Sequence, residues 1–85
     1  MIQIRYFASL RERLGAHEQV DAAELPQPRT VGALRDWLCA RSAAHAEAFA
    51  AARQVRAACN QVMCDDDEPL EDGAEVAFFP PVTGG

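Results

Sequence analysis

The residues best suited to chemistry are the last two of the sequence, Gly84 and Gly85. Glycine has no Cβ, so a terminal pair can enter a narrow active site and leaves the final carbonyl open to attack. A free carboxylate is a poor acyl donor until it is activated, for example as a mixed anhydride with AMP, after which its carbonyl accepts a nucleophile. A sulfur nucleophile would produce a thiocarboxylate and a lysine amine a protein conjugate. A frayed or tag-derived end is the alternative interpretation.

Two prolines stand just before this pair and predict how it is presented. Pro80 and Pro81 restrict φ and favour an extended chain, so residues 80–85 are expected to form a tail that protrudes from the domain. The four residues after Pro81 reach about 13 Å when extended. The sequence therefore predicts a tail that enters the active site of another protein.

Other reactive side chains give weaker signals. His17 and His45 lack a carboxylate or cysteine at ligand spacing and are expected to be surface histidines, and no metal site is predicted. The three cysteines (Cys39, Cys59 and Cys64) lack C-x-x-C spacing and are expected to be inert, buried or half-buried thiols. The acidic run 65–68 lacks the spacing of a calcium loop, which favours a solvated turn that assists electrostatic steering.

Composition limits the class of protein. The 85 residues suffice for one domain, expected to span 1–85, and 49% hydrophobic with 25% charged residues is typical of a globular protein. The net charge is −5 and all eight basic residues are arginine, so nucleic-acid binding is not expected, and a partner with a positive surface is. No segment resembles a membrane span or an export signal, and a reduced cytoplasmic protein is predicted.

The elements that must position the tail follow from hydrophobic periodicity and from turn residues. The alternation of side chains between two faces predicts a first strand over 1–7 and, more weakly, a second over 17–22. A last strand is predicted over 75–79, after a turn at Asp72-Gly73. Thr30 is placed to cap a helix whose apolar face carries Val31, Leu34, Trp37 and Leu38. The remaining predictions are a helix at 8–14, a short or irregular helix at 43–53, and two short strands within 55–64 about Asn60-Gln61. These elements predict an α+β domain with helices packed on one face of a mixed sheet.

Strand parity predicts an interaction surface. Phe7 and Phe79 alternate with the core residues Tyr6 and Phe78, so they are expected on the outer face of the sheet. Exposed aromatic residues that gather on one face are more often a docking patch than an accident, although they could simply cover a sheet edge.

The sequence also resembles a known family. Residues 69–85, which end in Phe-Phe-Pro-Pro-Val-Thr-Gly-Gly, are similar to the C-terminal signature of the small subunits of molybdopterin synthase. The opening Tyr6-Phe7-Ala8-Ser9-Leu10-Arg11-Glu12 and the helix start Thr30-Val31-Gly32-Ala33-Leu34 are similar too. The resemblance covers nearly the whole chain.

This resemblance implies a β-grasp, ubiquitin-like fold and a sulfur carrier for molybdenum cofactor synthesis. In that family an ATP-dependent, ubiquitin-activating-type enzyme adenylates the terminal glycine, which matches Gly85, and a sulfurtransferase or cysteine desulfurase system converts it to a thiocarboxylate. The large synthase subunit then receives the tail and transfers sulfur to cyclic pyranopterin monophosphate. No cofactor is implied on the carrier itself. The positions that match the family's reacting and docking residues are Gly84 and Gly85, then Phe7, Arg11, Met63, Phe79, Pro80, Pro81, Val82 and Thr83.

Three alternatives stay open at this point. A carrier of the same fold could serve thiamine or another sulfur-containing metabolite. A ubiquitin-like modifier would use the same Gly-Gly end to conjugate to lysines. A binding module would need neither glycine.

Overall fold

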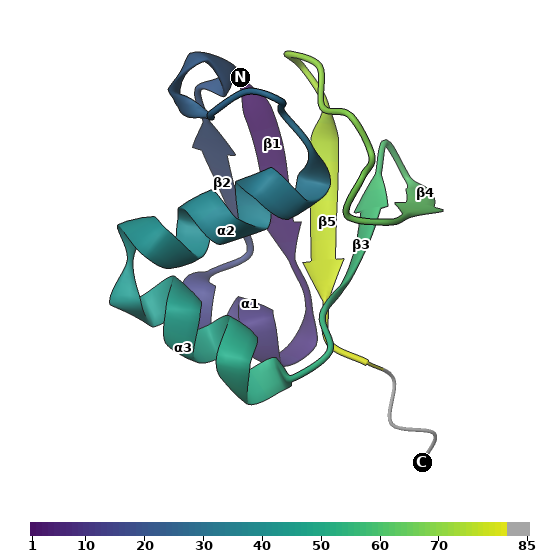
Figure 1. The fold of residues 1–85 in the computed structure, drawn as a ribbon. Helices are drawn as coiled ribbons and strands as arrows, with labels where there is room; N and C mark the ends of the chain where they lie inside the picture. The colour runs from purple at the N-terminus through teal and green to yellow at the C-terminus, as the bar shows by residue number, and fades with distance from the viewer. Residues whose placement is uncertain (82–85) are drawn as a thin grey trace.

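A mixed sheet forms the frame of the molecule. The computed structural model describes residues 1–81, and within them five strands pair in the order β2-β1-β5-β3-β4. Central β5 runs parallel to β1 and antiparallel to β3, and the outer pairs β1–β2 and β3–β4 are antiparallel. Figure 1 shows β5 in the middle of the sheet, so Pro80 and Pro81, which follow it, leave the sheet there. The strands are β1 (Ile2–Tyr6), β2 (His17–Val20), β3 (Arg56–Cys59), β4 (Val62–Cys64) and β5 (Glu75–Phe79).

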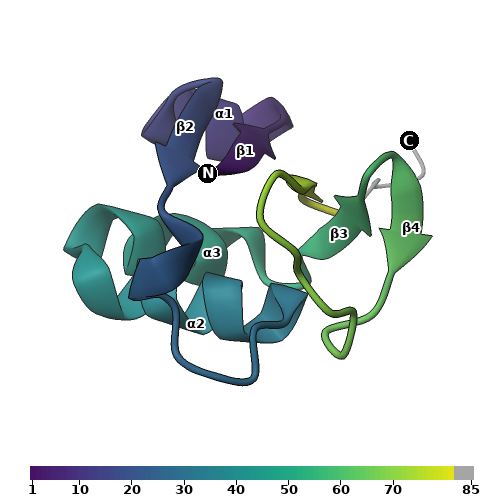
Figure 2. The same cartoon turned by 90° about the horizontal axis from the view of Figure 1, so that it is seen from above.

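Helices cover one side of this sheet. They are α1 (Ala8–Leu14), α2 (Val31–Arg41) and α3 (Ala43–Ala52), with a short 3-10 turn, η1 (Ala22–Glu24). The Thr30 hydroxyl accepts a hydrogen bond from the amide of Ala33 at 3.1 Å, which confirms the predicted cap. Ser42 ends α2 and caps α3. Figure 2 shows α2 and α3 on the same side of the sheet, and α1 packs against α3. The predicted α+β arrangement is confirmed.

The core lies between the sheet and these helices. Alternate residues of β1 and β5 point inward, and Ile2, Ile4, Tyr6, Val76 and Phe78 are all buried. The helical face that they meet carries Val31, Leu34 and Leu38, as predicted, whereas Trp37 is only partly buried. Phe49 of α3 packs edge-on against Phe78, with ring centroids 5.3 Å apart. Parity in the strands and the 3.6-residue period in α2 thus converge on one apolar layer.

Three element predictions need correction. Residues 43–52 form a regular α-helix, because Ser42 caps it and Phe49 anchors it in the core. The strand predicted over 17–22 ends at Val20, since the Asp21 carboxylate accepts a hydrogen bond from the amide of Ala23 and starts η1. The strand predicted over 1–7 covers Ile2–Tyr6. The two-residue turn Asn60–Gln61 is confirmed, with positive φ at both residues, the geometry that suits a tight hairpin.

No helix within residues 1–81 is both long and apolar enough to cross a membrane.

Candidate functional site

Two aromatic rings mark the outer face of the sheet. The parallel pairing of β1 and β5 aligns Tyr6 with Phe78, so the residues that follow, Phe7 and Phe79, lie side by side. Their ring centroids are 6.4 Å apart with planes at 80°, an edge-to-face contact. Phe7 is 45% exposed although it is a large apolar residue. The structure therefore places the two rings on the face that strand parity predicted.

Small residues form the floor of this surface. Register aligns Arg5, Ala77, Ala58 and Met63 in one row across β1, β5, β3 and β4. The two alanines leave a hollow of about 290 Å³. Met63, 49% exposed, stands at one end of the row. We define the outer-face patch as Phe7, Phe79, Met63, Ala58 and Ala77.

An ion pair borders the patch. The Arg5 guanidinium donates a hydrogen bond to the Glu75 carboxylate at 2.9 Å. This pair and the two alanines were missed by sequence reasoning, although alternate positions of β1, β5 and β3 could have identified all of them once the strand pairing was known. Arg11, also predicted to dock, is exposed on α1, and within residues 1–81 its side chain makes no hydrogen bond or ion pair.

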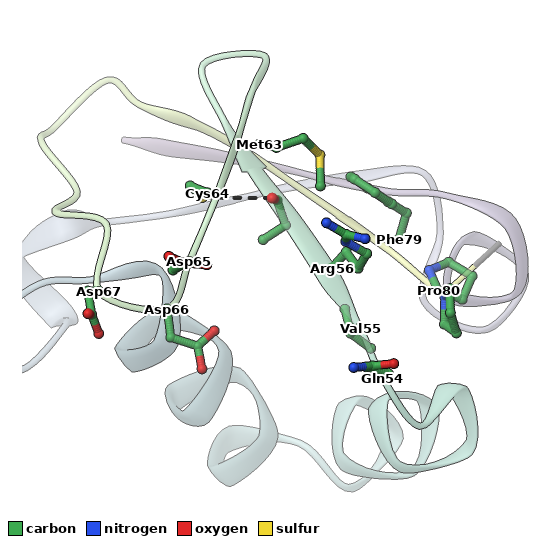
Figure 3. A pocket seen from close by; sticks show the side chains of 12 residues that line it. Gln54, Val55, Arg56, Met63, Cys64, Asp65, Asp66, Asp67, Phe79 and Pro80 are labelled. Atoms are coloured by element: carbon green, nitrogen blue, oxygen red, sulfur yellow. Dashed lines mark hydrogen bonds between the residues drawn. The ribbon is translucent and has the colours of Figure 1, made fainter.

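The start of the tail is fixed by the sheet. The amide of Phe7 donates a hydrogen bond to the carbonyl of Phe78 at 3.1 Å, which holds the end of β5 against the end of β1. Pro80 and Pro81 follow, both partly exposed, and border a groove beside β3 (Figure 3). The predicted reacting residues Gly84 and Gly85, together with Val82 and Thr83, lie outside the described residues.

The thiols are poor nucleophiles. Burial raises the pKa of Cys39, Cys59 and Cys64 above the ordinary thiol value. A raised pKa keeps each group in the protonated form, which neither attacks electrophiles nor binds metal well. Among the residues that the structure describes, no three His, Cys, Asp or Glu side chains gather as a metal site.

His45 was predicted at the surface, and that prediction is wrong. Its side chain is buried, and its Nε2 lies 2.8 Å from Oε2 of Glu18. Glu18 also accepts hydrogen bonds from the Tyr6 hydroxyl at 2.7 Å and from Arg41 at 2.8 Å. An acidic residue at an inward position of β2 thus turns His45 toward the core, because a partly buried carboxylate needs donors. His17, by contrast, is exposed and meets Gln3, as a surface histidine should.

The pKa values of this partly buried cluster fit its geometry. Burial raises the pKa of Glu18, but the hydrogen bonds from Arg41, Tyr6 and His45 outweigh that effect and hold it below the ordinary value. Burial and the Glu18 contact raise the pKa of Tyr6, so its hydroxyl remains a donor. The cluster joins β1, β2, α2 and α3 on the helix-covered side of the sheet, whereas the patch lies on the other. We therefore assign a stabilising role to the Glu18 cluster.

Comparison with known proteins identifies the family. Residues 4–85 match the sequence pattern of the ThiS family. The chain belongs to the ThiS family. Over the full length of both proteins, 85 residues, this ThiS-family chain is 46% identical to the molybdopterin synthase sulfur carrier subunit of Escherichia coli K12. It is 35% identical over 86 residues, again the whole of both chains, to the Haemophilus influenzae protein of the same name.

Solved structures share the fold of this ThiS-family chain. SAMP1 of Haloferax volcanii, a small archaeal modifier protein, is 28% identical with a TM-score of 0.64, over 99% of this chain and 98% of that one. A complex of subunits 1 and 2 of the Helicobacter pylori molybdopterin-converting factor gives a TM-score of 0.67 at 24% identity, over 99% and 97% of the chains. The latter likeness concerns the fold alone. The expected β-grasp, ubiquitin-like fold is confirmed.

Proposed function

We propose that this chain is the sulfur carrier subunit of a molybdopterin synthase and that the carboxyl group of Gly85 carries the sulfur. The observation that carries the proposal is the end-to-end relationship to the E. coli carrier, at 46% identity over all 85 residues. The sequence Phe-Phe-Pro-Pro-Val-Thr-Gly-Gly adds a chemical reason, because it ends in an unhindered carboxyl on a proline-stiffened stem.

The proposed reaction uses the carrier as a substrate. An adenylating enzyme joins the Gly85 carboxylate to AMP from ATP and releases pyrophosphate, which converts a poor leaving group into a good one. Persulfide sulfur from a sulfurtransferase or cysteine desulfurase displaces AMP and forms an acyl disulfide with Gly85. A thiol reductant then cleaves the S–S bond, which leaves the thiocarboxylate, a soft nucleophile, and releases the sulfur donor as a disulfide. Two such deliveries to cyclic pyranopterin monophosphate would supply both sulfurs of the dithiolene. The catalytic side chains then belong to the partners, in line with the inert thiols here.

The outer-face patch is proposed to dock the large subunit. Phe7, Met63 and Phe79 supply exposed apolar area beside the point where the chain end leaves the sheet. Arg11 is proposed to dock beside them, and residues 80–83 to lead Gly84 and Gly85 into the partner's active site. Exposed aromatic side chains around a shallow hollow are typical of interface centres.

The remaining parts of the proposal follow from this role. The carrier holds no cofactor of its own, and ATP is consumed by the adenylating enzyme. A cytoplasmic location is proposed with it, because a thiocarboxylate and three reduced thiols suit a reducing compartment.

The decisive measurement is the mass of the C-terminal fragment. Protein incubated with ATP, the cognate adenylating enzyme and a sulfur donor is cleaved after Glu75, and the fragment 76–85 is weighed. This fragment has neither Cys nor Met, so oxidation cannot imitate the replacement of oxygen by sulfur. We expect the sulfur-bearing mass. An unchanged mass, with the enzyme active on a control carrier, would overturn the proposal.

A variant of the last residue tests the role of the glycine. Gly85→Ala should fold normally, because its position lies beyond β5, but should lose sulfur transfer since a methyl group crowds the reacting carbonyl. Transfer assays are run beside an unfolding curve. Normal transfer by this variant would contradict the role assigned to the unhindered glycine, while the carrier function itself would stand if the thiocarboxylate forms.

A ubiquitin-like modifier is the second candidate, favoured by the likeness to the archaeal modifier SAMP1. It predicts adducts between Gly85 and lysines of other proteins that survive reducing agent. A carrier for thiamine uses the same chemistry. Restoration of molybdoenzyme activity in a strain that lacks its molybdopterin synthase carrier separates the proposed function from both.

A further inference from the structure

An open groove runs beside the stem of the tail. It encloses about 950 Å³ between the end of β5 and the turn that follows β4. Figure 3 shows Asp65, Asp66 and Asp67 along one side of it and Arg56, Phe79 and Pro80 along the other. Met63 and Phe79 belong both to this groove and to the outer-face patch. The groove therefore adjoins both the outer-face patch and the start of the tail.

The acidic side of the groove is held on a rigid support. The amides of Val31 and Gly32, at the start of α2, donate hydrogen bonds to the carbonyls of Glu68 and Asp66, both at 3.0 Å. A Cβ at Gly32 would lie 2.9 Å from the Cβ of Asp66, so the turn sits directly on the helix. The Arg35 guanidinium donates two hydrogen bonds, of 2.8 and 2.9 Å, to the Asp66 carboxylate. The turn is thus fixed through its middle residue.

The residues on either side of Asp66 have no such role. Asp65 and Asp67 are exposed, and in the part of the chain that the structure describes their carboxylates make no ion pair or side-chain hydrogen bond. Across the groove Arg56 is exposed and likewise forms no ion pair within residues 1–81. The groove therefore has two unneutralised anions on one wall and one unneutralised cation on the other.

We propose that this groove is a second docking surface, occupied by an extended segment of the large synthase subunit, the protein proposed to receive the tail for sulfur transfer. The segment presents Lys or Arg to Asp65 and Asp67, and an acidic or polar side chain to Arg56. The inference rests on the proposed function, because it assumes that a protein takes up the tail.

Charge and shape select this occupant. A chain of net charge −5 repels nucleic acid and acidic proteins, whereas a basic segment is attracted before contact. The groove is too open to enclose a small molecule, which would need most of its surface buried. Continuity with the outer-face patch lets one partner cover both surfaces at once.

The test compares two double variants that remove the same charge. Asp65→Asn with Asp67→Asn removes the acidic wall, and Glu24→Gln with Glu47→Gln removes two exposed carboxylates elsewhere, on η1 and α3. Dissociation constants of the full chain are measured calorimetrically with the cognate large subunit and with the cognate adenylating enzyme. We expect the groove pair to bind the large subunit about tenfold more weakly in dilute salt, the effect of two exposed ion pairs. The difference in dissociation constant between the groove pair and the parent should disappear in about 0.5 M salt. A loss confined to the adenylating enzyme would overturn this occupant.

The controls make each outcome decisive. Melting temperatures of the variants should match the parent, because neither Asp65 nor Asp67 supports the fold through its side chain. Arg56→Gln tests the opposite wall and should weaken the same complex about threefold. Unchanged binding of both partners by the groove pair, or an equal loss in the Glu24 and Glu47 control, would overturn the docking surface. Failure of the parent protein to acquire a thiocarboxylate would overturn the proposed function instead, whatever the binding result.

Discussion

Phe78 and Phe79 are neighbours in β5 with opposite surroundings. Phe78 is 1% exposed and packs against Tyr6 and Phe49, whereas Phe79 is partly exposed and contacts Phe7 on the face that the helices leave uncovered. The same residue type, one position apart, thus belongs to two different surfaces because side chains alternate across a strand. The inner face of the sheet therefore determines stability, while the outer face is available for recognition.

The largest expected effect is on the inner face. Phe78→Ala should reduce the free energy of unfolding by about 3–5 kcal/mol, because it removes a fully buried ring and leaves a cavity against Phe49. Denaturant titration measures the loss. The matched variant Phe79→Ala should lose less than about 1 kcal/mol. Equal losses in the two variants would break the distinction between the faces.

The next effect concerns the polar part of the inner face. Glu18→Gln should destabilise the protein by about 2 kcal/mol, since an amide cannot accept from Tyr6, His45 and Arg41 as the carboxylate does. Glu47→Gln, an exposed change of the same kind on α3, should have little effect.

The same variant predicts a pH dependence. The folded-state pKa of Glu18 is lowered, so its contribution is fully present above the ordinary glutamate pKa and is lost as pH falls through the folded value. The stability difference between the parent and Glu18→Gln should therefore shrink as pH falls from about 5 to about 3. Unfolding curves at several pH values measure this difference. A difference that grows in acid would contradict the assigned cluster.

On the outer face the expected loss is of affinity. Phe79→Ala should weaken binding to the large subunit by about tenfold or more while the protein stays folded, because truncation removes an anchor from the centre of the patch. Val62→Ala is the control. Val62 is 67% exposed but pairs with inward-facing Cys59, so it lies off the patch. Equal weakening by both variants would show that exposed apolar area in general, and not the patch, drives docking.

The smallest effect should come from the border of the patch. Glu75→Gln breaks the ion pair with Arg5, and an exposed pair contributes less than about 1 kcal/mol to stability. A loss of several kcal/mol would mean that the outer face supports the fold after all. Thermal or denaturant unfolding in low and high salt decides between these results.

Sequence reasoning predicted most of the frame and part of the site. The periods of β1, β5 and α2 placed the core residues and the pair Phe7 and Phe79 correctly, because these patterns depend only on local backbone geometry. The regularity of α3 was underestimated, because its alanine-rich sequence shows little contrast between an apolar and a polar face. Only the structure shows that Ser42 caps this helix and that Phe49 anchors it in the core.

The errors and omissions concern pairs of residues far apart in the chain. His45 and Glu18 are 27 positions apart, and Asp66 and Arg35 are 31 apart. No local pattern joins such residues, so His45 was assigned to the surface and the acidic groove was not recognised. The docking roles of Phe7, Phe79, Arg11, Met63 and residues 80–83, and the reacting role of Gly84 and Gly85, stay predictions.

Local sequence patterns were enough to show which strand residues alternate between the two faces, where Thr30 starts a helix, and that Gly84 and Gly85 form a pair suited to acyl chemistry. The position of β5 between β1 and β3 came only from the folded chain, and with it the side chains from distant segments that share the outer face, the Glu18 cluster and the groove. The physical reason is that periodicity and capping act within a few residues, whereas long-range pairing depends on how whole elements bury their apolar faces together.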